Sequence, residues 1–211
     1  MKHLSFTYVD AQTGIPCTHA PMRHGPAFPA IAGLSYGFAL ESQYPTATPT
    51  FYGTAPDGTH LAVPGVLAVL TEAEYTAAEQ AELAVRRAAA QAERQAARLA
   101  AEVGGYWYAG HPVDADRDSI LRITNAATTA LTCLITGQPF ATAWTCADGA
   151  KIPLDAIGVL ALQAALSTHG QACHDRSTAL KAMIDGATDL AALAAVAAEI
   201  GSGWPSEAAP A

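Results

Sequence analysis

Residues 71–103 form the segment that most restricts how this chain can fold. They include thirteen alanines in 33 positions, and no glycine or proline interrupts them before Gly104 and Gly105. Alanine has the highest helix propensity, so the segment predicts one uninterrupted helix. At 1.5 Å per residue this helix would be about 50 Å long, which is too long for the interior of a small domain. Thr71 and Glu74 have the spacing of a capping box, which predicts where the helix begins.

A heptad pattern runs along this predicted stem (residues 71–103). Counted from Tyr75, eight of the nine a and d positions are apolar, and these are the predicted oligomerisation residues: Tyr75, Ala78, Val85, Ala89, Ala92, Ala96, Leu99 and Val103. Gln80, Arg87 and Arg94 fall at f positions, which face outward in a coiled coil. Large core residues are absent between Val85 and Leu99, so a solvated helical linker remains the alternative to a self-associating coil.

Residues 1–70, before the stem, predict a small and irregular β module. They contain eight of the thirteen prolines, which exclude long central strands. Short strands are predicted at 3–9, 35–42, 48–52 and 60–63. Only five charged residues occur in this part of the chain. Charge depletion is typical of the core of an interface, so the module is interpreted as a docking module; a polar surface rich in Thr, Ser and Gly is the alternative.

Residues 104–205, after the stem, predict a mainly helical domain. Apolar residues at helical spacing predict a helix over about 120–135, which Gly137 ends. Segments 140–146 and 151–154 predict one β-hairpin. Further helices are predicted from Asp155 to Ile184, and over 190–200 after the cap residues Thr188 and Asp189; residues 206–211 are a predicted frayed tail. The predicted fold class is therefore α+β: a small Pro/Gly-rich β module, a long Ala-rich helical stem that could form a coiled coil, and a helical C-terminal domain with one hairpin.

Composition limits the classes of function. The net charge of −8 argues against binding to nucleic acid, because phosphate contacts require a basic face. The longest apolar runs are far shorter than the ~20 residues of a membrane-spanning helix, so membrane insertion is not expected. The N-terminus lacks the apolar stretch of a signal peptide, and synthesis in a cytoplasm is expected. The four cysteines are scattered and are expected to be free thiols.

A zinc site is the first chemical possibility. His169 and Cys173 are four residues apart, so both could lie on one face of a helix. Zinc requires two more ligands, and the spacing of Cys146 and Asp175 does not support them. Packing or surface roles are the preferred interpretation, with no metal and no cofactor expected.

Two further patterns could carry chemistry. Cys17 and His19 would point to the same side of a strand, but no glycine-bearing nucleophile turn accompanies them. Asp114, Asp116 and Asp118 resemble the start of a calcium loop, yet the glycine at its sixth position and the glutamate at its twelfth are missing. Helix capping is the preferred interpretation of these aspartates. The residues therefore predict a protein that is not an enzyme.

The order of features after the stem carries a resemblance. The matching features are Tyr106-Trp107-Tyr108, Asp116-Arg117-Asp118, a Gly-Gln-Pro-Phe turn (137–140), a hairpin (144–149), a long helix (about 155–185) and Gly-Trp-Pro (203–205). This half of the chain resembles a C-terminal domain of unknown function found in tail and tail-fibre-associated proteins of tailed bacteriophages. The start of the stem (71–75) is also similar to phage tail proteins. The resemblance implies a structural or assembly role, without enzymatic activity.

The resemblance implies a protein of the virion tail that is made in the cytoplasm of the bacterial host. Its expected partners are other phage tail proteins, further copies of itself, with a trimer favoured, and a host surface receptor. A tail-fibre assembly chaperone that leaves before the virion is complete is the alternative, although the charge-poor module favours permanent incorporation. A carbohydrate-binding adhesin is a third interpretation, in which aromatic residues stack on sugars or, alternatively, pack in the core: Tyr106, Trp107, Tyr108 and Trp144.

Overall fold

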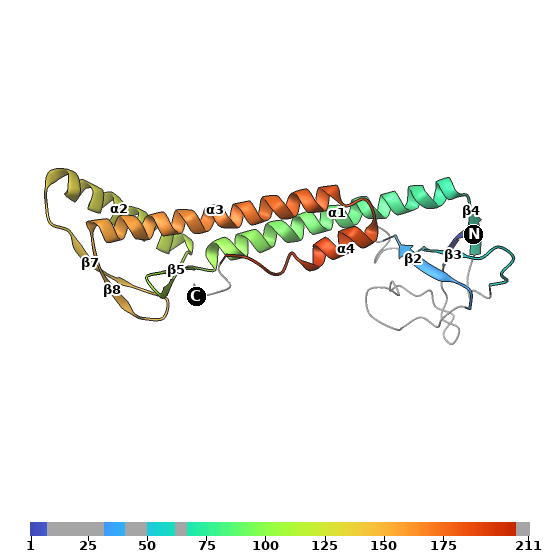
Figure 1. Ribbon diagram of the computed structural model, residues 1–211, viewed down its shortest axis with the longest axis horizontal. Helices are drawn as coiled ribbons and strands as arrows, with labels where there is room; N and C mark the ends of the chain where they lie inside the picture. Colours follow the sequence, from blue (N-terminus) through green and yellow to red (C-terminus); the bar gives the residue numbers. More distant parts are fainter. Residues whose placement is uncertain (8–31, 41–49, 62–66, 206–211) are drawn as a thin grey trace. The chain divides into compact units, whose positions relative to one another are not determined.

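A computed structural model of the protein describes residues 1–7, 32–40, 50–61 and 67–205 (Figure 1). The chain forms two compact units. The first comprises Met1–Ala90 with Ala187–Ala195, and the second comprises Gln91–Gly186 with Val196–Ala211. Helices and antiparallel strands occur together, so the fold class is α+β, as predicted.

The elements follow the chain in a simple order. The strands of the first unit are β1 (Lys2–Phe6), β2 (Ser35–Ala39), β3 (Phe51–Ala55) and β4 (Leu67–Leu70). Helix α1 (Glu72–Val103) contributes residues to both units. The second unit adds β5 (Tyr106–Tyr108), β6 (His111–Val113), α2 (Arg117–Thr136), β7 (Ala141–Thr145), β8 (Lys151–Asp155) and α3 (Ala156–Gly186), and α4 (Leu190–Ala198) follows.

The first unit contains an antiparallel sheet in the order β2-β3-β1-β4. Phe6 pairs with Phe51 across β1 and β3, and both side chains are fully buried. Three predicted strands are confirmed with different limits: β1 begins one residue before its predicted start, and β3 begins three residues after its predicted start. The predicted strand 60–63 is not formed at His60 and Leu61, and its other two residues lie outside the described part of the chain. Residues 67–70 pair with β1 instead. The sequence did not predict this strand, because the pairing is non-local and its short apolar run lies directly before the helix.

Helix α1 begins as its sequence predicts. The backbone N–H of Thr71 donates to Glu74 Oε2 at 2.8 Å, and the N–H of Glu74 donates to Thr71 Oγ1 at 3.2 Å, which completes the capping box. The helix ends at Val103, directly before Gly104 and Gly105. No helix in the described ranges is both long and apolar enough to cross a lipid bilayer.

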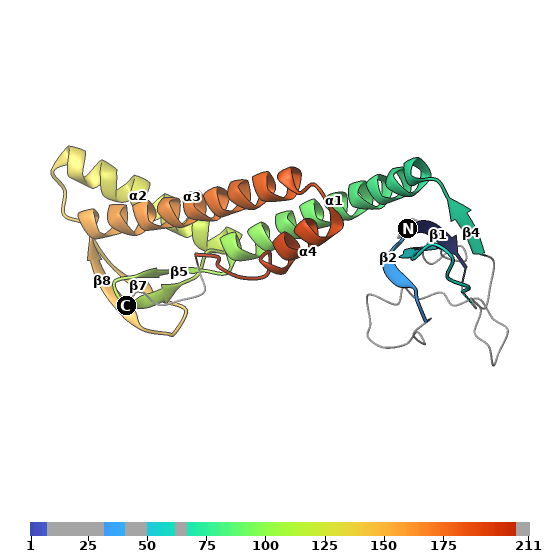
Figure 2. The same ribbon diagram turned by 45° about the vertical axis from the view of Figure 1, so that its right-hand side comes forward.

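The second unit is built around α3. Residues of α1 from Gln91 onward run beside it, and both views show the two helices side by side (Figures 1 and 2). Gln91 Nε2 donates to Asp185 Oδ1 at 2.8 Å, and His169 Nε2 lies 3.1 Å from the carbonyl oxygen of Ala101. At the other end of α3, α2 and the hairpins enclose an apolar core that includes Ile123, Val159 and Leu162. Asp155 accepts from the N–H of Gly158, which confirms the predicted cap of α3.

The second unit differs from its prediction in one element, because it has two hairpins rather than one. Strands β5 and β6 pair from Tyr106–Val113 to Tyr108–His111. The tight turn between them depends on positive φ angles at Ala109 (50°) and Gly110 (82°). The aromatic run was evident in the sequence, but its partner strand contains a proline, which weakens any strand prediction.

Gly105 provides a test of how β5 is held. Its φ is +97°, and a Cβ built there would lie 2.8 Å from the backbone oxygen of Val113. We expect Gly105→Ala to destabilise the protein by about 2 kcal/mol or more, from left-handed strain plus displacement of β6. Gly110→Ala is the matched control, because φ is +82° there and nothing lies within 4 Å; it should lose only about 1 kcal/mol. Urea denaturation followed by circular dichroism measures both changes, and equal losses would contradict this account.

Candidate functional site

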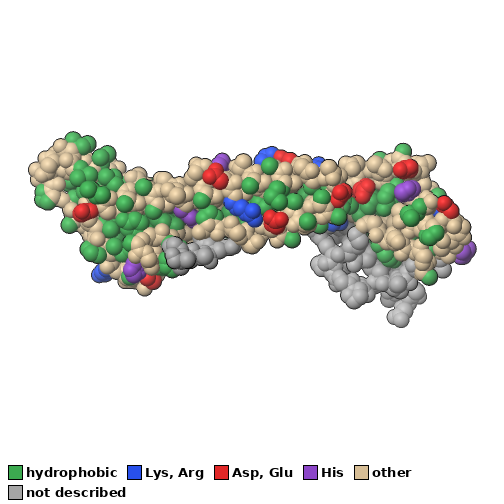
Figure 3. Space-filling model, viewed as in Figure 1, with side chains coloured by type: hydrophobic (Ala, Val, Ile, Leu, Met, Phe, Trp, Pro, Cys, Tyr) green, Lys and Arg blue, Asp and Glu red, His purple; other side chains and the backbone are tan. Residues whose placement is uncertain are grey.

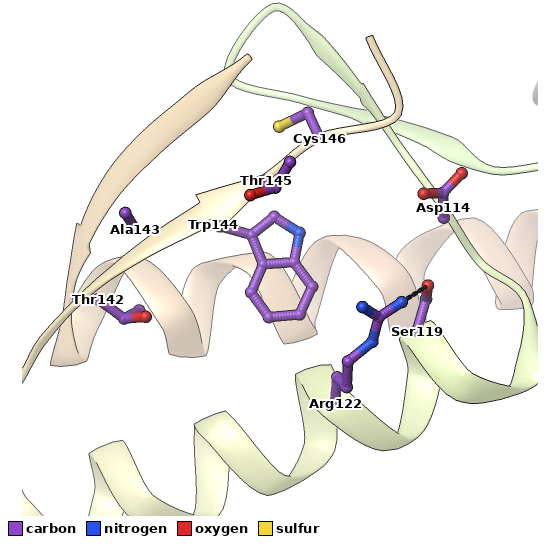
Figure 4. A pocket seen from close by; sticks show the side chains of 8 residues that line it. All are labelled: Asp114, Ser119, Arg122, Thr142, Ala143, Trp144, Thr145 and Cys146. Atoms are coloured by element: carbon purple, nitrogen blue, oxygen red, sulfur yellow. Dashed lines mark hydrogen bonds between the residues drawn. The ribbon is translucent and has the colours of Figure 1, made fainter. Parts of the chain in front are cut away.

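A cavity of about 360 Å³ lies between the start of α2 and strand β7 (Figure 4). Its polar lining includes Asp114, Ser119 and Arg122 from the α2 side, and Trp144 and Cys146 come from the hairpin side. Figure 4 shows the indole of Trp144 facing α2, with the guanidinium of Arg122 beside it. The cavity therefore combines one aromatic wall with charged groups of both signs.

The α2 side of the cavity is set by the helix cap. Asp116 precedes α2 in an extended conformation, and its Oδ1 accepts from the N–H groups of Asp118 (2.8 Å) and Ser119 (2.9 Å). These bonds lower the pKa of the Asp116 carboxyl, and the bond from the backbone N–H of Ser119 has the largest effect. The Ser119 hydroxyl also accepts from Arg122 Nη2 at 2.9 Å. The cap thus holds the serine, and the serine orients the guanidinium.

The hairpin side is fixed to β5–β6. The N–H of Ala147 donates to the Pro112 carbonyl at 2.9 Å, and His111 Nδ1 lies 3.0 Å from Asp148 Oδ2. The side-chain hydrogen bond with His111 is the main cause that lowers the pKa of Asp148. Trp144 is half-buried and packs against the apolar core, so one side of its ring supports the fold and the rest lines the cavity.

The four predicted aromatic residues have different roles. The hydroxyl of Tyr106 donates to the Leu162 carbonyl at 3.2 Å, and that of Tyr108 donates to the Gly158 carbonyl at 3.0 Å. Burial raises the pKa of Tyr106 far above its ordinary value. These two rings therefore pack against α3. Trp107 is half-buried and does not line the cavity, so Trp144 alone of the four faces it.

The His–Cys pair belongs to the packing of α3 on α1. Cys173 Sγ lies 3.8 Å from His169 Nε2, and the same nitrogen faces the Ala101 carbonyl. A nitrogen that donates to a carbonyl carries its proton, so it is not free to act as a base toward the thiol. Burial raises the pKa of Cys173, which keeps the thiol protonated. In the described ranges, no three His, Cys, Asp or Glu side chains form a group that could hold a metal ion; Cys17 and His19 lie outside those ranges.

The predicted oligomerisation residues of α1 separate into two groups. Tyr75 packs within the first unit, where its ring centroid lies 4.7 Å from that of His3 and 5.4 Å from that of Phe38. Ala78 is half-buried. The other six are exposed in this chain: Val85 and Ala89 in the first unit, and Ala92, Ala96, Leu99 and Val103 in the second.

Of the predicted f positions of α1, Gln80 is exposed, but Arg87 and Arg94 do not face outward, contrary to the prediction. Arg87 Nη2 donates to the Ala187 carbonyl at 2.7 Å in the first unit, and Arg94 bonds to Ser177 of α3 in the second. The physical reason is that the small alanine side chains of α1 let these arginines reach polar groups elsewhere in the same chain. Glu82, the one polar residue among the nine heptad positions, is fully buried and pairs with Arg86 at 2.7 Å.

Sequence reasoning missed Arg122 as a site residue. It follows the Asp-rich helix start and lies three residues after Ser119, so its reach toward the cap was a usable signal. Asp114 was noted only as a possible cap or calcium ligand; the structure gives the cap to Asp116 and leaves Asp114 at the cavity.

A family model described as a domain of unknown function (DUF4376) matches residues 84–199. This match spans more than half of the chain, and the chain belongs to that family. It includes the cavity, α2, α3 and the exposed face of α1 from Val85 onward, whereas the β-sheet of the first unit lies outside it. Comparisons with curated proteins and with solved structures gave no match.

The state of the thiols can be tested by alkylation. Burial raises the pKa of both Cys146 and Cys173, whereas Cys133 is half-buried. Because the thiolate is the reactive form, we expect iodoacetamide at neutral pH to label Cys133 faster than the other two by on the order of tenfold or more. Peptide mass spectrometry measures the three rates, and equal rates in denaturant provide the control. Labelling of Cys173 as fast as that of Cys133 would restore a reactive thiol at α3.

Proposed function

We propose that the protein is a structural component of a bacteriophage tail, either a short tail fibre or a fibre-associated protein. It acts by docking to other tail proteins and by associating with copies of itself. The phage context rests on the resemblance of the sequence to tail-associated proteins. The mode of action rests on the surfaces of the second unit.

The exposed face of α1 in the second unit carries the proposal. Leu99 and Val103 are 50% and 56% exposed, and Ala92 and Ala96 continue the same a/d face. The opposite face of the helix contacts α3 through Arg94 and Ala101. An apolar face at four-and-three spacing that is exposed in the described part of its unit is suited to a second helix.

The exposed apolar side chains of α1 set the scale of what association would contribute. Burying the exposed half of Leu99 or Val103 contributes about 1 kcal/mol for each side chain. Alanines add little apolar area, but they allow helix axes to approach within about 8 Å. Each added copy brings the same side chains, so a trimer gains more than a dimer.

The end of α2 offers a second apolar surface, suited to a different tail protein. Leu131, Leu134 and Ile135 are all exposed, and Ile135 is 77% exposed. Figure 3 shows hydrophobic side chains gathered over α2. Grouped apolar side chains on a surface are typical of protein–protein contacts, which supports docking as the mode of action.

Self-association can be tested with a matched pair of leucines. Leu99 on α1 and Leu121 on α2 are 50% and 52% exposed. We expect the full chain to sediment as a multiple of its 21.7 kDa mass. Leu99→Glu should reduce the sedimenting mass to that of one chain, because a buried carboxylate in the helix interface lacks a partner. Leu121→Glu should leave the oligomer intact. A monomeric wild-type chain, or an oligomer that survives Leu99→Glu, would contradict the proposed α1 interface.

The virion role can be tested by quantitative mass spectrometry of highly purified phage particles. We expect peptides of this chain at a constant ratio to known tail proteins. Peptides that are abundant in the infected-cell lysate but missing from particles would overturn the structural role. They would favour the assembly chaperone, whose work ends before the particle is complete.

A further inference from the structure

We infer that the cavity between α2 and β7 binds a single neutral sugar residue of a glycan. The inference is independent of the proposed tail function, because it rests on the lining of the cavity alone. It assigns a ligand class to the groups that line the cavity on Trp144, Arg122 and Asp114.

The first step is the aromatic wall. Trp144 is half-buried, with part of its ring against the core and part lining the cavity. A pyranose ring has one face dominated by C–H groups, and such a face packs on an aromatic ring with loss of little hydration. A tryptophan held from behind is a rigid platform, so its position is set before a ligand arrives.

The second step is the hydrogen-bonding capacity that the fold leaves unused. Arg122 uses Nη2 toward Ser119 Oγ (2.9 Å) and Nε toward the Asp118 carbonyl (3.4 Å). Its Nη1 has no hydrogen-bond partner among the described residues, and neither has the Asp114 carboxylate. The cavity therefore presents an oriented charged donor and a charged acceptor, both available to a ligand.

The third step is the choice of ligand charge. An anion attracted by Arg122 would also face Asp114, and a cation would face the guanidinium. Hydroxyl groups both donate and accept, so a neutral polyol can satisfy the two side chains at once. Charge-assisted bonds of this kind are the stronger ones.

The fourth step is size. A volume of about 360 Å³ falls near the lower end of the roughly 300–1,000 Å³ typical of ligand sites. One sugar residue suits this space, which points to the end or a branch of a glycan. The two anchored sides, the α2 cap and the joined hairpins, make the cavity a built feature of the second unit.

The test follows the indole N–H signals of the full chain by NMR. Trp107, Trp144 and Trp204 each supply one signal, and Trp144→Phe identifies that of Trp144. The probes are the methyl glycosides of glucose, galactose and mannose, with glucuronate as the charged counterpart of glucose. We expect at least one neutral glycoside to shift the Trp144 signal with a Kd of about 1–10 mM. Glucuronate should bind more weakly than glucose.

The variants separate a binding site from a packing role. Arg122→Met and Asp114→Asn change exposed residues, so the fold should persist, and each should weaken binding on the order of tenfold. Trp107→Phe, outside the cavity, should leave binding unchanged. The inference is overturned if none of the three glycosides shifts the signal up to about 100 mM. It is equally overturned if glucuronate binds best, or if both cavity variants bind like the wild type.

Discussion

Helix α3 is the element on which the second unit depends, because α1, α2 and both hairpins contact it. Alanine-rich helices bury little apolar area, so polar contacts have an unusual share in fixing their register. Arg94 reaches Ser177, and the His169 ring meets the Ala101 carbonyl. Buried polar groups must be paired, and sliding one helix along the other would break these bonds together. Everything else in the unit, including α2 and both hairpins, is attached to α3.

Helix α2 shows how a thin core can support a surface for contacts. Ile123, Ala127 and Ala130 bury its inner face against α3 and the hairpins. Threonines along the rest of the helix donate to carbonyls one turn earlier, so their hydroxyls require no outside partner: Thr124, Thr128, Thr129, Thr132 and Thr136. These hydroxyls are therefore satisfied within the helix, while the apolar side chains near its end remain exposed to solvent.

Local signals in the sequence predicted the helix limits well, and non-local contacts could not be predicted. The caps at Thr71, Asp155 and Asp189 involve atoms within three residues, so they can be predicted from local sequence alone. Gly137, in the left-handed conformation, ends α2 for the same local reason.

The predictions that were wrong or incomplete concern features that local sequence signals do not determine. Alanine fits any helical phase, so the heptad pattern could not reveal which face of α1 packs against α3. Arg122 and Trp144 line the same cavity but belong to different elements, so their spacing in the sequence could not predict that they lie together. The β5–β6 hairpin was missed because its turn relies on backbone angles of Ala109 and Gly110 rather than on a recognisable motif.

The two opposite faces of α1 have a consequence for how strongly a glycan surface is held. One face contacts α3 within the second unit, and the residues of the opposite face are exposed. If three copies join through that face, each assembly displays three identical cavities. A site that binds one sugar weakly then works through avidity, since linked sites can raise overall binding by roughly 10²–10⁴ without any new contact. A loosely bound sugar, released quickly at each single site, would let such an assembly move across a surface and still remain attached to it.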